Sequence, residues 1–125
     1  MAIRVLHVGL GPIGAAVARQ VAERPGFRIV GGIDIDPAKA GRDLGEVAGL
    51  GRRLRVKVTD DPVKGLRAAK PDVVVLCTGS SVRSVLPQVQ AILKARVPIV
   101  STTEELVYPG YTHVRQARQI DAWAK

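Results

Sequence analysis

Cysteine, aromatic residues and long apolar runs are scarce in this chain of 125 residues, and each scarcity excludes a class of protein. The single cysteine, Cys77, cannot form an intrachain disulfide, which favours a reducing, cytoplasmic location. The longest apolar run, residues 73–77, is far too short to cross a bilayer, and the first four residues do not resemble a signal peptide. With 46% hydrophobic but only 3% aromatic residues, we expect a domain with an aliphatic core and no membrane partner.

Acidic residues are also in the minority, because 11 Asp and Glu oppose 19 Lys and Arg and leave a formal net charge of +8. Such an imbalance raises the question of nucleic-acid binding. The basic residues are mostly spread along the chain, however, and few aromatic rings are present to stack on bases. The densest basic cluster, residues 52–57, is typical of an exposed edge strand that avoids pairing with other chains. We therefore expect no nucleic-acid partner.

Short β-branched runs alternate with helical stretches from one end of the chain to the other. We expect strands at residues 3–9, 27–34, 54–58, 72–77 and 98–101. We expect helices at residues 13–24, 61–69, 81–95 and 110–125, and a short irregular helical piece at 36–40. The very apolar strand 72–77 belongs in the middle of a sheet. Within the helical stretch 81–95, Pro87 indicates that the helix proper begins near that residue. The alternation predicts one Rossmann-type α/β domain over residues 1–125, with a doubly wound, mostly parallel sheet and helices on both faces.

Three glycines, Gly9, Gly11 and Gly14, form a G-x-G-x-x-G array between the first expected strand and the first expected helix. In that context, Gly9 allows a tight turn, Gly11 lets a pyrophosphate approach the backbone, and Gly14 lets the helix pack closely on the strand. Asp34 follows the second strand, where a carboxylate can accept hydrogen bonds from an adenine ribose. The array therefore predicts a dinucleotide site that holds NAD or NADP.

The carboxylate of Asp34 favours NAD, since it repels a 2′-phosphate. Lys39 and Arg42 follow closely and can screen that charge, so use of NADP stays open. Asp36 precedes a proline and is interpreted as a cap of the next turn in preference to a second ribose ligand.

Two other turns follow strands and belong at the same edge of the sheet. After the fourth strand, Thr78 and Ser80 offer hydroxyls and Gly79 permits close approach of a ligand, although a serine there can equally cap a turn. Cys77 is interpreted as a buried core thiol, and His7, in the middle of the first strand, as a hydrogen-bonded core histidine.

The stretch "STTEELVYPG" at residues 101–110 follows the fifth strand. It places Glu104 and Glu105 close to the expected nicotinamide end of a cofactor. On the residues alone, the simpler interpretation is a helix start with a threonine cap and glutamates in the first turn.

Four segments carry a resemblance to a known family: "IRVLHVGLGPIGAAVARQV", "GGIDIDPAKAGRDLGEV", "PDVVVLCTGSSV" and "VPIVSTTEELVYP". Together they resemble the N-terminal cofactor domain of the dihydrodipicolinate-reductase-like superfamily, and within it the branch of 2,4-diaminopentanoate and amine dehydrogenases. The resemblance implies reversible oxidative deamination of an amine by hydride transfer. The residues that it implies for the cofactor are Gly9, Gly11, Pro12, Ile13, Gly14 and Asp34, with Thr78, Gly79 and Thr102 along the nicotinamide half.

The resemblance also implies that Glu104 faces the substrate amine, where a carboxylate can hold an ammonium or orient an attacking water. A dihydrodipicolinate reductase of the lysine pathway is the alternative, although this chain lacks the Gly-Thr-Thr-Gly turn expected of one. A stand-alone nucleotide-binding module without chemistry is a second alternative. Because relatives carry a C-terminal domain that completes the substrate site and often forms a homodimer, we expect the chain to be a truncated fragment that is inactive alone.

Overall fold

The computed structural model describes residues 1–106 and 113–125, and its strands form one five-stranded sheet of order β3-β2-β1-β4-β5. The strands are β1 (Ile3–Val8), β2 (Phe27–Ile33), β3 (Val58–Thr59), β4 (Val73–Leu76) and β5 (Ile99–Ser101). Every neighbouring pair is parallel. The chain builds outward from β1 first on one side and then on the other, which is the doubly wound arrangement. The predicted Rossmann-type α/β fold is confirmed, with β4 inside the sheet beside the central strand.

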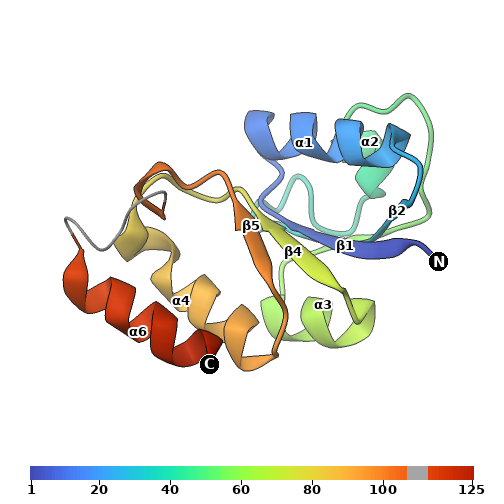
Figure 1. Cartoon of the computed structure of the whole chain (residues 1–125). Helices are drawn as coiled ribbons and strands as arrows, with labels where there is room; N and C mark the ends of the chain where they lie inside the picture. The colour runs from blue at the N-terminus through green and yellow to red at the C-terminus, as the bar shows by residue number, and fades with distance from the viewer. Residues whose placement is uncertain (107–112) are drawn as a thin grey trace.

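Helices cover both faces of this sheet, with α1 and α2 on one side and α3, α4 and α6 on the other (Figure 1). Their bounds are α1 (Pro12–Glu23), α2 (Leu44–Val47), α3 (Pro62–Ala69), α4 (Val82–Lys94) and α6 (Val114–Ala124), with a 3₁₀ turn η1 at Glu104–Leu106. None of the helices in the described part of the chain has the length and apolar character needed to cross a membrane.

Two aliphatic clusters hold these layers together. Leu6 and Val8 of β1 belong to the cluster that joins β4 to α4, together with Leu76 and Val85. The second cluster joins β2 to α1 and α2 and contains Leu10, Ala15, Ala18, Ile29, Leu44, Ala48 and Val58. The expected aliphatic core is therefore observed, split by the sheet as a two-faced layer structure requires.

Asp43 organises the connection between β2 and β3. Its buried carboxylate accepts hydrogen bonds from the backbone N–H groups of Gly45 (2.9 Å), Leu54 (2.8 Å) and Val56 (2.9 Å). Burial by itself raises the pKa of Asp43, but these N–H groups, joined by that of Arg55, outweigh burial and hold the pKa below its usual value. The strand predicted at 54–58 is therefore wrong in its bounds, because residues 54 and 56 donate to a side chain instead of to a strand, and β3 is only Val58–Thr59.

Two helical expectations also need correction. Helix α4 begins at Val82 and not near Pro87, because Glu105 and Ser81 satisfy its first turn: Val82 N–H donates to Glu105 Oε1 (2.9 Å) and Val85 N–H to the Ser81 carbonyl (3.2 Å). Because its first turn is stabilised in this way, α4 tolerates Pro87, which has no backbone N–H to donate. The helical piece expected at 36–40 is a hydrogen-bonded turn, closed by Ala40 N–H donating to the Asp36 carbonyl (3.0 Å).

Candidate functional site

The carboxyl ends of β1, β2 and β4 meet at one edge of the sheet and enclose a pocket of about 340 Å³. Four of the predicted site residues line it, namely Gly9, Gly11, Asp34 and Thr78. Ile35, Asp36, Lys39, Cys77 and Gln88 complete the lining. The pocket therefore lies where ligands of doubly wound sheets bind.

The glycine turn is shaped differently at each of its three glycines. Gly9 has a φ of +91°, and a Cβ there would lie 2.5 Å from the carbonyl oxygen of Cys77. A Cβ on Gly14 would overlap the carbonyl oxygen of Gly9, so the helix can approach the strand this closely only without a side chain. A Cβ on Gly11 would have no neighbour within 4 Å. Gly9 and Gly14 are thus required by the close packing of backbone segments in the turn, whereas Gly11 borders open space that a ligand can fill.

The first turn of α1 presents unused backbone donors to this open space. Its N-cap is Gly11, which has no capping side chain, and Pro12 at the first helical position has no N–H. Ala15 N–H makes the hydrogen bond that closes the first turn, to the Gly11 carbonyl (2.8 Å). The N–H groups of Ile13 and Gly14 therefore lack acceptors within the helix, and together with the helix dipole they suit a phosphate.

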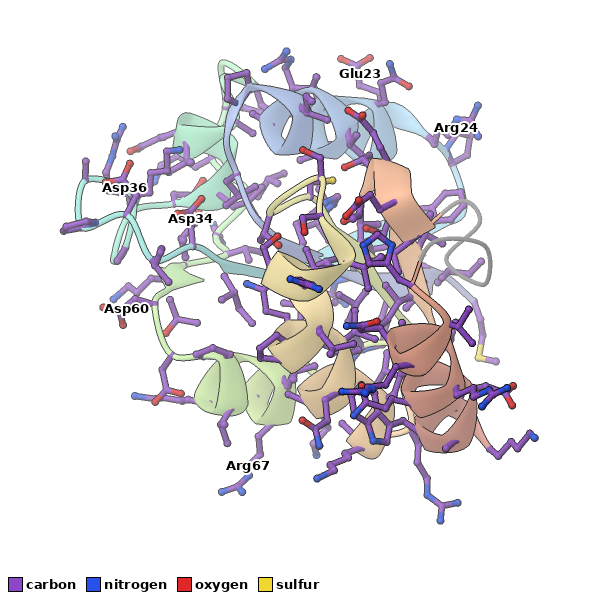
Figure 2. The ribbon with its side chains drawn as sticks, turned by 90° about the vertical axis from the view of Figure 1, so that its left-hand side faces the viewer. Glu23, Arg24, Asp34, Asp36, Asp60 and Arg67 are labelled. Carbon is purple, nitrogen blue, oxygen red and sulfur yellow. The ribbon has the colours of Figure 1, made fainter. Side chains whose placement is uncertain are left out.

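Asp34 ties the glycine turn to the end of β2. Its Oδ2 accepts from the backbone N–H of Leu10 (2.8 Å) and its Oδ1 from that of Asp36 (2.9 Å). The side chain is only 12% exposed, and Asp36 lies beside it at the same end of the molecule (Figure 2). Each carboxylate oxygen retains a lone pair beyond these bonds, so Asp34 can still accept from two hydroxyl groups.

Asp36 takes the capping role that the sequence predicts, because its Oδ1 accepts from the backbone N–H of Ala38 (2.9 Å). Lys39 extends back from this turn over the glycine turn. Its ammonium donates to the Leu10 carbonyl (2.9 Å) and lies 3.9 Å from Asp34 Oδ2 and 3.8 Å from Asp36 Oδ2. In the described part of the chain, the Arg42 side chain forms no hydrogen bond or ion pair.

The remaining predicted residues lie outside the pocket lining. Pro12 and Ile13 belong to the first turn of α1, while Gly79, Ser80 and Thr102 lie on the turns after β4 and β5. The backbone carbonyl of Ser80 accepts from Glu105 N–H (3.2 Å), which links these two turns. The helix cap is the carboxylate of Glu105, described above, and neither Ser80 nor Ser81 provides a side-chain cap.

Glu104 is exposed, unlike the working cap Glu105 beside it. Among the described residues it forms no hydrogen bond and no ion pair, so its carboxylate is available to a ligand. The rest of the predicted stretch, residues 107–110, lies outside the described residues.

The sequence did not identify Gln88 as a pocket residue, and it identified Lys39 only as a charge that can screen Asp34; both side chains line the pocket. Gln88 lies on the second turn of α4 and accepts a hydrogen bond from Thr78 Oγ1 at the pocket wall (2.5 Å). It is a polar residue between the buried Val85 and Val89 of the same helix. That position is visible in the sequence, but only the docking of α4 beside the β4 turn shows that it faces the pocket.

Two buried-residue expectations were wrong in part. Cys77 is half-buried and lines the pocket, instead of being buried in the core. His7 is only 1% exposed, as expected, but neither ring nitrogen has a hydrogen-bond partner among the described residues. Its burial lowers the pKa from 6.5 to about 4, so His7 is a neutral histidine near neutral pH.

A second hollow of about 370 Å³ lies between β2, β3 and α3. Its wall is formed largely by small residues, among them Gly31, Gly32, Gly65, Ala68 and Ala69. It contains neither the glycine turn nor Asp34, so the candidate site stays at the carboxyl edge. Within the described residues, no group of His, Cys, Asp and Glu side chains could hold a metal ion.

The fold and this site define a Rossmann-type domain whose glycine turn and strand-end carboxylate are arranged as in dinucleotide-binding proteins. The family described as "Dihydrodipicolinate reductase, N-terminus" matches residues 3–118, and the chain belongs to this family.

Individual relatives agree with that assignment. An amine dehydrogenase of Streptomyces virginiae is 34% identical over 107 residues, which cover 84% of this chain and 29% of the relative. A 2,4-diaminopentanoate dehydrogenase of Acetoanaerobium sticklandii is 27% identical over 138 residues, covering 98% of this chain and 35% of the relative. The structure of an amine dehydrogenase from Mycobacterium smegmatis superposes with a TM-score of 0.95 at 34% identity, over 100% of this chain and 37% of that one. The chain thus spans about a third of the length of these proteins.

Proposed function

We propose that this chain is the NAD(P)-binding part of an oxidoreductase that acts on amines by reversible oxidative deamination. The observation that carries the proposal is the joined pair of glycine turn and carboxylate: Gly11 borders open space, and Asp34 holds the same turn through Leu10 N–H. Support for the amine chemistry comes from the names of the two dehydrogenase relatives.

The residues present fit a dinucleotide. The free N–H groups of Ile13 and Gly14 would hold the pyrophosphate, while Asp34 would accept from the adenine ribose hydroxyls. Thr78, Gly79, Ser80 and Thr102 would line the nicotinamide half. When bound, the nicotinamide supplies the acceptor or donor of hydride. We further propose that NAD is preferred, because the Asp34 carboxylate repels a 2′-phosphate.

Glu104 is the residue that we assign to the substrate. Its exposed carboxylate has no partner among the described residues, so it is free to hold a substrate ammonium or to orient the water that attacks an imine. Glu105 is already engaged at the start of α4 and cannot serve both purposes at once. This contrast supports a division of labour between two adjacent glutamates.

Calorimetric titration of the chain with NAD and NADP tests the cofactor assignment. We expect binding of NAD, and we expect Asp34→Ala to weaken NAD more than NADP, with exposed Asp60→Ala as the matched control. Absence of binding of either dinucleotide at millimolar concentration, by a folded chain, would refute the proposal. Equal losses for both cofactors in Asp34→Ala would refute the ribose role alone.

The substrate assignment is tested in the complete gene product by a screen of amines with NAD and NADP. Glu104→Gln should abolish most of the turnover while leaving cofactor affinity unchanged. Glu105→Gln is the matched control and should affect stability more than turnover. Full activity of Glu104→Gln would overturn its role.

In the same preparation, light scattering tests our further proposal that the protein is a homodimer formed through a second domain.

A reductase of the lysine pathway is the second candidate, because the matching family carries that name and a 4-hydroxy-tetrahydrodipicolinate reductase of Nostoc is 33% identical over 106 residues. Against it stand Cys77-Thr78-Gly79-Ser80 and Ser101-Thr102-Thr103-Glu104 in place of the expected Gly-Thr-Thr-Gly turn. Reduction of 4-hydroxy-tetrahydrodipicolinate, with no oxidation of any amine, would favour this candidate.

A further inference from the structure

A basic hollow lies at the amino edge of the sheet, where β1 and β2 begin, at the end of the strands opposite to the glycine turn. The N-terminus marks this edge (Figure 1). The hollow has a volume of about 430 Å³, which is in the range of pockets that hold small molecules. Four of the eight described residues that line it are cationic and none is acidic. The cationic residues are Arg4, Arg28, Arg55 and Lys57.

The sheet places two of these cations side by side. Arg4 and Arg28 are partners in the parallel register of β1 and β2, where like charges repel each other. The Arg4 guanidinium is held in place, because its Nε donates to the Lys70 carbonyl (3.1 Å) and its Nη2 to the Ala69 carbonyl (2.7 Å). These neutral acceptors do not cancel its charge. Arg28 is exposed and, within the described part of the chain, its side chain forms no hydrogen bond or ion pair.

Arg55 is held in a conformation that its residue type rarely adopts. Its φ of 62° is left-handed, and such backbone strain concentrates at functional positions. The two other non-glycine residues of positive φ in the described structure each follow a helix, α3 or α4, where this conformation is common. Arg55 follows no helix. Its neighbours Leu54 and Val56 donate to the buried Asp43 carboxylate (2.8 and 2.9 Å), which fixes the backbone while the exposed Arg55 side chain lines the hollow.

Protection of a sheet edge does not explain this cation. The strand in this run of basic residues is only Val58–Thr59, and Arg55 lies outside it. Arg53, close by in the chain, pairs with Glu46 at 3.6 Å. Among the described residues, however, the side chains of Arg55 and Lys57 have no hydrogen-bond or ion-pair partner. The hollow therefore collects cations that the described chain leaves without an anion.

We propose that the basic hollow binds a compact polyphosphate, either an inorganic chain or the triphosphate of a nucleotide. A phosphate chain carries negative charge on every phosphorus, so one small ligand can face several cations. Guanidinium groups bind phosphate through two parallel N–H···O bonds, and three of the four cations are arginines. A nucleic-acid strand fits less well, because it needs aromatic rings for stacking and none lines the described hollow. The inference does not depend on the proposed function, because the hollow lies at the other edge of the sheet.

Titration calorimetry of the chain with tripolyphosphate, ATP and citrate, without metal ions, tests the proposal. We expect tripolyphosphate to bind, and Arg28→Gln and Arg55→Gln each to weaken it roughly fivefold or more. Arg118→Gln, exposed on α6, is the matched control and should change nothing. Both results with ATP support the site: equal affinity means that the phosphate chain alone is recognised, and tighter binding identifies a nucleotide as the ligand. Absence of tripolyphosphate binding at millimolar concentration, or equally tight citrate, would overturn the proposal.

The glycine turn is the competing place for a phosphate, and Gly11→Ala separates the two. This variant should bind tripolyphosphate as the unaltered chain does. Loss of binding in Gly11→Ala, with full binding in Arg55→Gln, would move the ligand to the dinucleotide site and overturn the proposal. A chain that binds tripolyphosphate at the hollow but neither NAD nor NADP refutes the proposed function alone.

Arg55→Gly gives a readout that a purely structural role would not produce. Glycine adopts a φ of 62° without strain, so this variant should be at least as stable in urea as the unaltered chain. It should nevertheless bind tripolyphosphate as weakly as Arg55→Gln. A less stable Arg55→Gly that keeps full binding would make Arg55 a structural residue and count against the site. Binding of a mixed-sequence oligonucleotide but not of tripolyphosphate, weakened by Arg55→Gln, would replace the proposal with a nucleic-acid surface.

Discussion

Mild acid should weaken the fold through His7. The buried ring keeps a pKa of about 4 in the folded chain, against 6.5 for an exposed histidine, so the folded state stays neutral at pH 5 while the unfolded state is protonated. Stability is therefore complete above the unfolded pKa and is lost as the pH falls from 6.5 towards 4. This pKa difference corresponds to about 2 kcal/mol at pH 5 and about 3 kcal/mol below pH 4. In a domain of this size, about 2 kcal/mol lowers the melting temperature by roughly 7 °C.

The decisive variant is His7→Leu, which removes both the titration and the two unpartnered ring nitrogens. Urea denaturation at pH 8 and pH 5 should show the loss in the unaltered chain and only a small remainder in the variant. At pH 8 the variant should be as stable as the unaltered chain or more so, because an apolar group replaces a buried polar group without partners.

The chain contains two histidines, so His113→Gln, which removes the imidazole that lies 3.6 Å from Glu105 Oε2, tests the other histidine in the same urea assay. Asp43 does not interfere in this window, because a carboxylate with a lowered pKa loses its stabilising effect only below the usual pKa of aspartate, near 4. The reasoning is refuted if His7→Leu loses as much stability between pH 8 and pH 5 as the unaltered chain.

Three further substitutions test the glycine turn and the β2–β3 connection. Gly14→Ala should cost about 3 kcal/mol or more in unfolding free energy, because its Cβ would meet the Gly9 carbonyl. Gly11→Ala should fold with stability within about 1 kcal/mol yet bind NAD roughly tenfold more weakly; normal binding would place the pyrophosphate elsewhere. Asp43→Ala should cost about 3 kcal/mol in urea denaturation by stranding three backbone N–H groups, whereas exposed Asp60→Ala should stay within about 0.5 kcal/mol.

The fold class and most element positions could be predicted because the relevant signals are local. Strand-period apolar runs, the Pro25-Gly26 stop after the first helix and the Asp61-Pro62 start of α3 depend on neighbouring residues alone. The glycine array could be interpreted from local sequence for the same reason, since the strand before it, the turn and the helix after it are contiguous in the chain. Asp34 could be added because parallel strands end at one edge of the sheet.

The errors arise where a distant side chain decides the local structure. Nothing in residues 54–58 reveals that the Asp43 carboxylate accepts hydrogen bonds from their backbone N–H groups. A strand was therefore predicted where the structure has a loop. Likewise the start of α4 depends on Glu105, which lies 23 residues away from Val82. Such pairings become visible only when the topology brings the two segments together.

The two adjacent glutamates show how structure narrows a functional hypothesis that sequence leaves open. On the residues alone, Glu104 and Glu105 are both interpreted as acids in the first turn of a helix, and only the family resemblance assigns Glu104 to the substrate. In the structure, the Glu105 carboxylate caps α4 by accepting a hydrogen bond from Val82 N–H. The predicted helix start is confirmed in part, because both glutamates lie in the 3₁₀ turn η1, but among the described residues only the Glu105 carboxylate accepts a hydrogen bond. Glu104, an exposed carboxylate in the turn after β5, is therefore the residue on which a substrate assignment should be tested first.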